Sequence, residues 1–327
     1  MNYVMCLGEA LVDFIAQTKV PDLGASELFR RAPGGAVSNV AVGVARLGDH
    51  ARFAGTLSKD AFGSFLLRTL ARENVNVDNV RLVDAATTLA FVARGESGAR
   101  DFFFVRRPGA DSLLQASDLV EEEVKGAAIF HFGGVLLASE PARSTSLLAA
   151  RWARNGGALV SFDPNARPAL FASAEDMRAA LREGCSLAHL IKLSDEDLAA
   201  IGAPSDDPRR LFEGATEAIA LTRGAAGASW FTKDGESGTV RAPRVEAVDT
   251  TGAGDATTAG VLHVLASKMR RGGARGATAV RDAVRADVLD VAVRYGCAAG
   301  TLACLREGAI PSLQTPEAVE AMLSRSE

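Results

Sequence analysis

Short, mostly apolar runs alternate along the chain with longer segments in which apolar residues recur every three or four positions. The first part of this pattern predicts a strand, a helix, a strand and a helix at residues 3–8, 36–48, 51–57 and 62–73. It resumes with strands and helices at residues 127–133, 142–155, 158–164, 175–184, 189–194 and 218–224. Alternation of this kind is typical of βαβ units. We therefore predict an α/β fold with a doubly wound, mostly parallel sheet flanked by helices.

Two segments interrupt the alternation. Residues 13–32 and 87–107 have strand-like alternation and Gly turns without an intervening helix. They predict a small antiparallel sheet, set apart from the main one, that forms a lid over an active site; two surface hairpins without a function are the alternative. No stretch resembles an interdomain linker, so residues 1–327 are expected to form a single domain. Open strand edges need covering, which predicts a homodimer that pairs lid to lid.

Composition places the chain among ordinary globular proteins. Of its 327 residues 48% are hydrophobic and 23% are charged, and the formal net charge is −4. No long run of one sign is present, which argues against a nucleic-acid or anionic membrane partner. No uncharged stretch approaches the roughly 20 apolar residues that span a bilayer. The four cysteines form no C-x-x-C pair and no basic signal segment opens the chain, so we expect a cytoplasmic protein.

The stretch DTTGAGDATTAG, residues 249–260, carries the strongest chemical signal. Gly252, Ala253 and Gly254 allow a tight turn with uncovered N–H groups, and the apolar spacing that follows predicts a helix. A helix N-terminus favours a bound anion, especially phosphate. Asp255 would repel a resting anion, but it could accept the proton of a hydroxyl that attacks a phosphoryl group. The alternative is a first-turn aspartate that interacts only with the helix dipole.

This stretch resembles the second signature of the ribokinase-like (PfkB) sugar kinases. In that family the aspartate at the position of Asp255 is the catalytic base, and the residues matching Gly252, Ala253 and Gly254 form the anion hole. The family often has an aromatic residue where this chain has Thr257. The first signature of the family, a Gly-Gly turn with an Asn at the start of a helix, resembles APGGAVSN here. No Walker G-x-x-x-x-G-K-[ST] motif is present, so the P-loop class of nucleotide hydrolase lacks its residues.

The resemblance also implies a sugar site. Paired glycines let a small ligand approach the backbone, and an Asn offers both a donor and an acceptor to sugar hydroxyls. The segments DPNARPALF and GARDFFFVRRPGAD are similar to segments of fructokinases, and the first also resembles 2-keto-3-deoxygluconate kinases. Helix starts, a turn aspartate and loop arginines paired with nearby acids are the alternatives at these positions. The residues implied in sugar binding are Asp13, Gly34, Gly35, Asn39, Arg106 and Arg167.

Nucleotide and cation sites are implied in the same way. IKLSDEDL resembles the family segment that organises Mg²⁺ and phosphate, although a Ser N-cap followed by acidic residues explains the same letters. ALTRGAAGASWF resembles the strand-turn-strand that carries ATP, and a Gly-dependent turn is compatible with it. CLREGAIPS resembles a K⁺ loop, and an ordinary loop is its alternative. The implied nucleotide residues are Lys192, Ser194, Asp197, Thr222, Gly224 and Gly227; the implied K⁺ residues are Asp249, Thr251, Ala303, Arg306, Gly308 and Ser312.

Taken together, these segments imply an ATP-dependent sugar kinase that uses ATP and Mg²⁺ and also K⁺. The expected reaction converts D-fructose to fructose 6-phosphate at a primary hydroxyl. A 2-keto-3-deoxygluconate kinase is an alternative, because Arg106 and Arg167 could bind a sugar-acid carboxylate. A catalytically silent sugar- or nucleotide-binding regulator on the same fold is an alternative of another class. Sugar-dependent release of ADP distinguishes the enzyme from the regulator.

Overall fold

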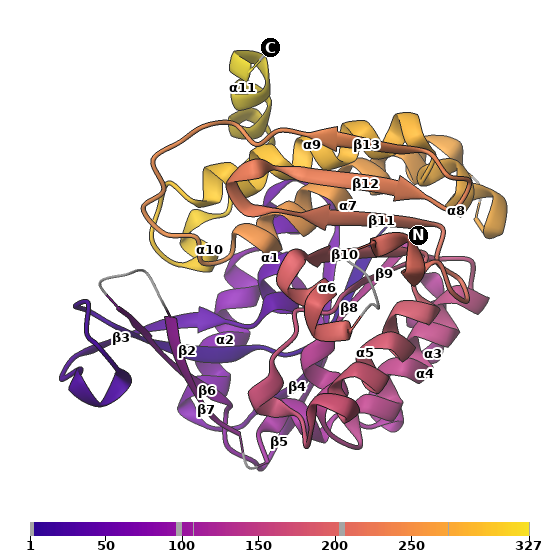
Figure 1. Cartoon of the computed structure of the whole chain (residues 1–327). Helices are drawn as coiled ribbons and strands as arrows, with labels where there is room; N and C mark the ends of the chain where they lie inside the picture. The colour runs from indigo at the N-terminus through magenta and orange to yellow at the C-terminus, as the bar shows by residue number, and fades with distance from the viewer. Residues whose placement is uncertain (1–2, 96–99, 107, 203–206, 274, 327) are drawn as a thin grey trace.

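The predicted strands form a nine-stranded sheet with helices on both faces, in a computed structural model that describes residues 3–95, 100–106, 108–202, 207–273 and 275–326 (Figure 1). The strand order is β13-β12-β11-β10-β9-β8-β1-β4-β5. The strands from β11 to β5 are parallel to their neighbours, and β12 is antiparallel to β11 and β13. Their bounds are Val4–Leu7 (β1), Ala51–Ser58 (β4), Asn76–Val83 (β5), Ile129–Gly133 (β8), Leu159–Asp163 (β9), Leu190–Ser194 (β10), Ala218–Thr222 (β11), Ala228–Thr232 (β12) and Ser237–Val240 (β13).

Helices follow most of the parallel strands, as the alternating pattern predicted. The predicted doubly wound α/β fold is therefore confirmed. The helices are Ala36–Arg46 (α1), Ala61–Arg72 (α2), Glu121–Gly126 (α3), Ala142–Asn155 (α4), Ala174–Leu187 (α5), Asp195–Ile201 (α6), Ala253–Gly272 (α7), Ala277–Ala283 (α8), Ala286–Ala303 (α9), Ala309–Ser312 (α10) and Pro316–Ser326 (α11). None of the helices in the described part of the chain is long and apolar enough to cross a membrane.

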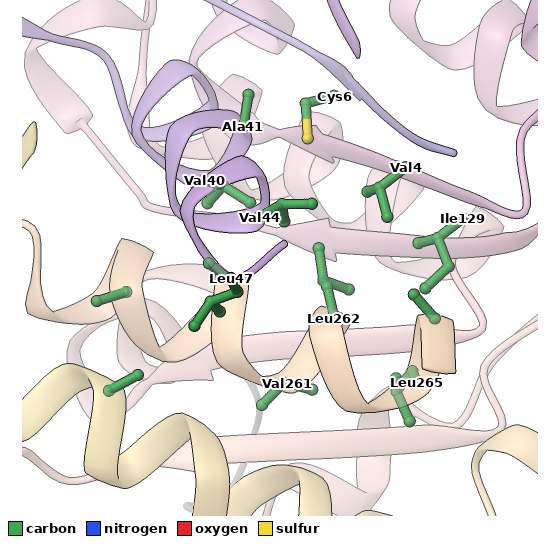
Figure 2. Packing of buried hydrophobic residues seen from close by; sticks show 14 of the residues in the cluster. Val4, Cys6, Val40, Ala41, Val44, Leu47, Ile129, Val261, Leu262 and Leu265 are labelled. Atoms are coloured by element: carbon green, nitrogen blue, oxygen red, sulfur yellow. The ribbon is translucent and has the colours of Figure 1, made fainter. Parts of the chain in front are cut away.

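Strand β1 shows why the sheet is buried on both faces. Its alternate residues belong to two separate hydrophobic clusters: Val4 and Cys6 to one, Met5 and Leu7 to the other. Figure 2 shows the first cluster, where side chains of α1 and α7 pack against β1 and β8. The second cluster packs α4 and α5 against the opposite face. Because both faces are covered, the strands are apolar throughout instead of alternating with polar residues.

The small sheet has the strand order β3-β2-β6-β7 and lies beside α2 (Figure 1). Its strands are Leu11–Ala16 (β2), Phe29–Gly34 (β3), Leu89–Arg94 (β6) and Arg100–Val105 (β7), close to the two segments that the sequence singled out. Each hairpin, β2–β3 and β6–β7, is antiparallel as predicted, and the two hairpins join through a parallel pairing of β2 with β6. Phe14 on β2 packs edge-on against Phe62 of α2, with ring centroids 5.8 Å apart, which attaches the small sheet to the main body.

The carboxyl ends of the parallel strands are where ligands bind in open α/β sheets, and binding is most common where the strand order reverses. Here β1 lies between β8 and β4, so the order reverses at β1. Asp163 is the last residue of β9, and Ser194 and Thr222 are the last residues of β10 and β11. The fold therefore brings the predicted nucleotide segments to the edge of the sheet from which β2 also departs.

Candidate active site

The turn before α7 is the centre of the site. Gly252 is the N-cap of α7 with φ of 79°, and a Cβ at this position would lie 2.8 Å from Cα of Ala309. Both facts require glycine. The helix begins at Ala253 without a capping side chain, and the first-turn N–H groups of Gly254 and Asp255 have no acceptor within the helix. These donors and the helix dipole favour an anion at this turn.

Asp255 is held by α1. Asn39, in the first turn of α1, donates from Nδ2 to Oδ2 of Asp255 at 2.8 Å. Desolvation raises the pKa of Asp255 to about 6, although the Asn39 hydrogen bond and the charge of Lys192 act in the opposite direction. A carboxylate with a pKa in this range is a better proton acceptor than an ordinary surface aspartate. Its environment thus suits the predicted base.

Asp13 approaches the same site from β2. A Cβ at Gly34 would lie 2.3 Å from Oδ2 of Asp13, so the carboxylate packs directly against the glycine backbone. Gly35 has φ of 104°, and α1 begins immediately after it. Desolvation and the negative charge of Asp255 raise the pKa of Asp13 to about 7. The structure therefore brings the predicted Gly-Gly turn, Asp13 and Asp255 together.

Arg167 lies after β9 and acts electrostatically on both Asp13 and Asp255. Its positive charge acts to lower the pKa of both Asp13 and Asp255. The guanidinium donates from Nη1 to the carbonyl oxygen of Ala166 at 2.9 Å. A guanidinium has five donors, so this bond leaves others that can bind sugar or phosphate oxygens.

Lys192 forms a buried ion pair beneath the first turn of α7. Its Nζ lies 2.9 Å from Oδ2 of Asp163, and the two side chains are 7% and 6% exposed. Thr258 of α7 donates to the same carboxylate oxygen at 3.3 Å. A Cβ at Gly254 would lie 3.1 Å from Nζ of Lys192, so the ammonium group supports the turn from below. Sequence reasoning assigned Lys192 to phosphate and did not identify its partner.

Ser194 and Asp197 form a reciprocal cap at the start of α6. The Ser194 hydroxyl accepts from the backbone N–H of Asp197 at 3.1 Å, and Oδ2 of Asp197 accepts from the N–H and hydroxyl of Ser194 at 2.9 and 2.8 Å. Oδ1 of Asp197 accepts from the N–H of Ala166 at 2.7 Å. Ser194 is therefore the N-cap of α6, which was the alternative interpretation of this segment. The bond from Ala166 to Asp197 ties α6 to the loop that carries Arg167.

The predicted strand-turn-strand connects β11 to β12. Thr222 donates to the carbonyl oxygen of Leu193 at 3.2 Å at the end of β11. Gly227 has φ of 101°, and a Cβ there would lie 2.0 Å from the carbonyl oxygen of Val240. A Cβ at Gly224 would meet no heavy atom within 4 Å. The turn thus needs glycine at both positions for its backbone, since Gly224 has φ of 52°, and the open space at Gly224 is available to a ligand.

Arg106 forms a buried ion pair with Asp111. Its Nη2 lies 2.7 Å from Oδ2 of Asp111, and the side chains are 6% and 1% exposed. Its Nε donates to the same oxygen at 2.9 Å. Arg107 lies outside the described residues.

The predicted cation loops meet at Asp249. Oδ1 of Asp249 accepts from the N–H and the hydroxyl of Thr251 at 2.9 and 2.7 Å, and Oδ2 accepts from the N–H of Gly308 at 2.9 Å. Ser312 is buried and donates to the carbonyl oxygen of Ala309 at 2.7 Å. Of the other two residues predicted for this site, Ala303 is the last residue of α9, and Arg306 is exposed in the segment that follows it.

The structure explains why Thr257 stands where the family often has an aromatic residue. Thr257 donates to the carbonyl oxygen of Ala253 at 2.8 Å, and a Cβ at Gly300 of α9 would lie 2.2 Å from its Oγ1. This close approach of α7 and α9 leaves no room for an aromatic ring.

Glu9, which sequence reasoning did not select, is buried and accepts from the N–H of Ala36 at 2.7 Å. Its position directly after the first strand was the available signal.

Comparisons with known proteins agree with this geometry. The family model described as pfkB family carbohydrate kinase matches residues 1–316. A relative from Arabidopsis thaliana, named as probable fructokinase-6, chloroplastic, is 40% identical over 98% of this chain and 82% of its own length. A crystal structure of fructokinase with bound ATP from Xylella fastidiosa is 32% identical with a TM-score of 0.90, covering 100% of this chain and 99% of that chain.

A third similar structure is a double mutant of fructokinase from Vibrio cholerae O395 in a form with fructose, ADP and potassium ion bound. It is 28% identical with a TM-score of 0.82, covering 99% of this chain and 98% of that chain. The match of the family model over most of the chain, together with the 40% identity to a full-length relative, shows the family. This chain belongs to the pfkB family of carbohydrate kinases.

Proposed function

We propose that this kinase transfers the γ-phosphoryl group of ATP to the 6-hydroxyl of D-fructose and forms fructose 6-phosphate. The observation that carries the proposal is the placement of Asp255. Its carboxylate is held by Asn39 at 2.8 Å, in the same turn as the uncovered amides of α7. Similar proteins named as fructokinases support fructose as the sugar.

Asp255 is the base in this mechanism. The sugar hydroxyl oxygen attacks the γ-phosphorus, its proton passes to the Asp255 carboxylate, and the bond from the γ-phosphorus to the oxygen it shares with the β-phosphate breaks. The proposed anion hole is the turn of Gly252, Ala253 and Gly254, whose amides, together with that of Asp255, stabilise the charge on the transferring group. Because the base is already fixed by Asn39, little reorganisation is needed when the sugar arrives.

The sugar is held by Asp13, the Gly34–Gly35 turn, Asn39 and Arg167. A carboxylate accepts hydrogen bonds from sugar hydroxyls, and Asp13 lies close enough to Asp255 for its pKa to respond to that charge. Arg106, which is paired with Asp111, stays among the proposed sugar-binding residues. The two carboxylates of Asp13 and Asp255 favour a neutral sugar over a sugar acid, since a third carboxylate would be repelled.

ATP is proposed to lie across the ends of β10 and β11, over Lys192, Ser194, Asp197, Thr222, Gly224 and Gly227. The donor set does not fit a protein-made magnesium cage, because both oxygens of Asp197 already accept from protein N–H or O–H groups. Among the described residues no cluster of three acidic, His or Cys side chains could hold a metal ion. Mg²⁺ is therefore proposed to arrive with ATP and to be held by phosphates and water.

A potassium ion is proposed at the loops joined by Asp249. The carboxylate connects the backbone of residues 249–251 to Gly308, which orders the carbonyl groups of both segments for a cation. Thr251, Ala303, Arg306, Gly308 and Ser312 are the proposed partners of the ion. Replacing potassium chloride by tetramethylammonium chloride should lower the rate, since the larger cation cannot enter a site sized for K⁺.

A sugar panel tests the substrate. Release of ADP is measured with fructose, ribose, 2-keto-3-deoxygluconate and nucleosides as acceptors, at equal enzyme concentration. The proposal expects the highest kcat/KM with fructose. A preference for 2-keto-3-deoxygluconate would contradict fructose as the substrate but not the kinase activity. No acceptor-dependent release of ADP with any compound would contradict both the substrate and the activity.

The acid side of the pH profile should report the two carboxylates. Desolvation raises the pKa of Asp255 to about 6 and that of Asp13 to about 7, and both act as acceptors only when ionised. We therefore expect kcat/KM for fructose to fall steadily as the pH is lowered from about 7 to below 6. Initial rates between pH 5 and 9 measure this. A profile that is flat down to pH 5 would contradict the proposed roles.

We also propose that the lid pairs with the lid of a second copy. Its exposed apolar side chains include Leu28, Phe102, Phe103 and Val105, which are 65%, 42%, 59% and 45% exposed. Phe103→Glu should convert the dimer to a monomer, because the charge would have to be buried in the interface. Light scattering at micromolar concentration measures the mass. Val291→Glu on α9, where Val291 is 55% exposed, is the matched control and should stay dimeric.

A single domain spanning residues 1–327 and a cytoplasmic location remain part of this proposal. Both rest on sequence composition: no stretch resembles a linker, and the four cysteines form no C-x-x-C pair. Among the described residues Cys6, Cys185 and Cys297 are free thiols, which agrees with a reducing compartment.

A further inference from the structure

The β6–β7 hairpin is attached to the main body at both of its ends by one carboxylate. Thr88 precedes β6 and Arg106 follows β7, so these two residues are the roots of the hairpin. Oδ1 of Asp111 accepts from the Thr88 hydroxyl, and Oδ2 accepts from Nε of Arg106 at 2.9 Å. Thr88 and Asp111 are both 2% exposed. Both oxygens of a buried carboxylate are thus used to hold the same hairpin.

Asp111 itself is fixed to the large sheet. It lies in a single 3₁₀ turn, Ala110–Leu113, whose first residue accepts from the Thr56 hydroxyl of β4 at 2.6 Å. The N–H of Ala110 donates to the carbonyl oxygen of Ala86 at 2.9 Å. The clamp is also tightly packed, since a Cβ at Gly109 would lie 1.9 Å from Oγ1 of Thr88 and 2.7 Å from Oδ1 of Asp111.

Thr88 connects this clamp to the sugar site. Its carbonyl oxygen accepts from the N–H of Val12 at 3.1 Å, and Val12 is the neighbour of Asp13 on β2. Asp13 is in turn in parallel register with Ala90 of β6. A shift of the hairpin roots would therefore move the strand that carries Asp13, although Asp111 does not itself reach the sugar.

We propose that Asp111 is a positioning residue for sugar binding: its carboxylate clamps Thr88 and Arg106 and, through Thr88, sets the position of Asp13. This inference rests on the proposed function for its sugar. It gives Arg106 a role in the clamp. It also distinguishes Asp111 from a residue that only stabilises the fold, because loss of the clamp should affect the sugar more than ATP.

Thr88→Ala is the principal test, since it removes one arm of the clamp and leaves the buried ion pair intact. The KM for fructose should rise about threefold to tenfold, the range expected for one lost hydrogen bond. The kcat and the KM for ATP should change less than twofold. Backbone amides of residues 89–94 and 100–105 should exchange faster with deuterium. Asp84→Asn, at a carboxylate that is 82% exposed in its pair with Lys59, is the control and should change neither readout.

Gly109→Ala tests the same junction from the opposite direction. The added Cβ would displace Thr88, so this variant should also raise the KM for fructose. Removing the Thr88 side chain relieves the closer of the two clashes and leaves the one with Asp111, so the double variant with Thr88→Ala should show less than the product of the two single effects. Asp111→Asn should have the largest effect on the KM for fructose. If Asp111→Asn does not fold, Thr88→Ala still tests the clamp.

The outcomes separate the two proposals. A wild-type enzyme that is inactive with fructose would overturn the proposed function, while amide exchange of the hairpin in Thr88→Ala still tests the clamp. A wild-type enzyme that is active, with unchanged KM for fructose and unchanged exchange in Thr88→Ala, would overturn the clamp. A Thr88→Ala variant that only melts at a lower temperature, with wild-type KM, would reduce Asp111 to a structural residue and would also overturn it.

Discussion

Asp255→Asn should lower kcat by about three orders of magnitude. This is the middle of the range of about a hundredfold to ten-thousandfold that a general base contributes. The amide keeps the shape of the side chain and can still accept from Asn39, which donates to the carboxylate at 2.8 Å in the unmodified chain. The KM for fructose should therefore stay within about threefold. Steady-state rates at saturating ATP measure both constants. Asp234→Asn, at an exposed turn between β12 and β13, is the matched control and should retain full activity.

The same variant should be more stable at alkaline pH. Desolvation raises the pKa of Asp255 from the unfolded value of 3.8 to about 6. The folded protein then holds a proton that the unfolded chain has lost between about pH 4 and 6, so this group's contribution to stability falls as pH rises through that window. Above it the folded state carries a buried charge, which Asn lacks. Thermal melts at pH 8 should show a higher Tm for Asp255→Asn. A lower Tm together with near-normal kcat would contradict both roles.

Lys192→Met should cause the largest loss of stability, about 3–5 kcal/mol, which is typical when one partner of a buried ion pair is removed. Met fills a similar volume but leaves Asp163 without the ammonium group that lies 2.9 Å from its Oδ2. Denaturant unfolding measures the free energy. Lys233→Met is the control, because the pair of Lys233 with Glu217 spans 3.8 Å and Lys233 is 45% exposed; its effect should be below about 1 kcal/mol.

The activity of Lys192→Met should also shift with pH. The positive charge of Lys192 lowers the pKa of Asp255, so its removal should move the acid limb of the rate profile to higher pH. Adding Asp163→Asn removes the unpaired carboxylate and should recover part of the lost stability, because a buried neutral pair needs no counter-charge. A double variant that is less stable than Lys192→Met would argue against the ion pair as the cause.

The fold was predictable because its periodicities are local. Runs such as Ile129–Gly133, buried at every position, and amphipathic helices such as Ala142–Asn155 can each be identified from about ten residues. The parallel junction of the two hairpins of the small sheet was not predictable in this way. It pairs Asp13 with Ala90, residues far apart in the chain, and neither strand has a pattern that distinguishes parallel from antiparallel neighbours.

In the candidate site, too, features formed by adjacent residues could be predicted, and contacts between distant residues could not. Asp255 and its turn could be predicted because the small residues, the carboxylate and the helix start are adjacent in sequence. The partner of Lys192 lies 29 positions away at Asp163, and nothing in either segment indicates the pairing. The partner of Arg106 is nearer, because Asp111 is only five residues further on. The sequence does not report that both side chains are buried.

The position of the transferred phosphate tests the central claim most directly. Fructose has primary hydroxyls at C1 and C6, and phosphorus NMR of the product formed from equimolar ATP and fructose distinguishes the two phosphates. The account predicts fructose 6-phosphate in a one-to-one ratio with ADP, formed by the unmodified enzyme and about a thousandfold more slowly by Asp255→Asn. Fructose 1-phosphate, or ADP without a sugar phosphate, would contradict it.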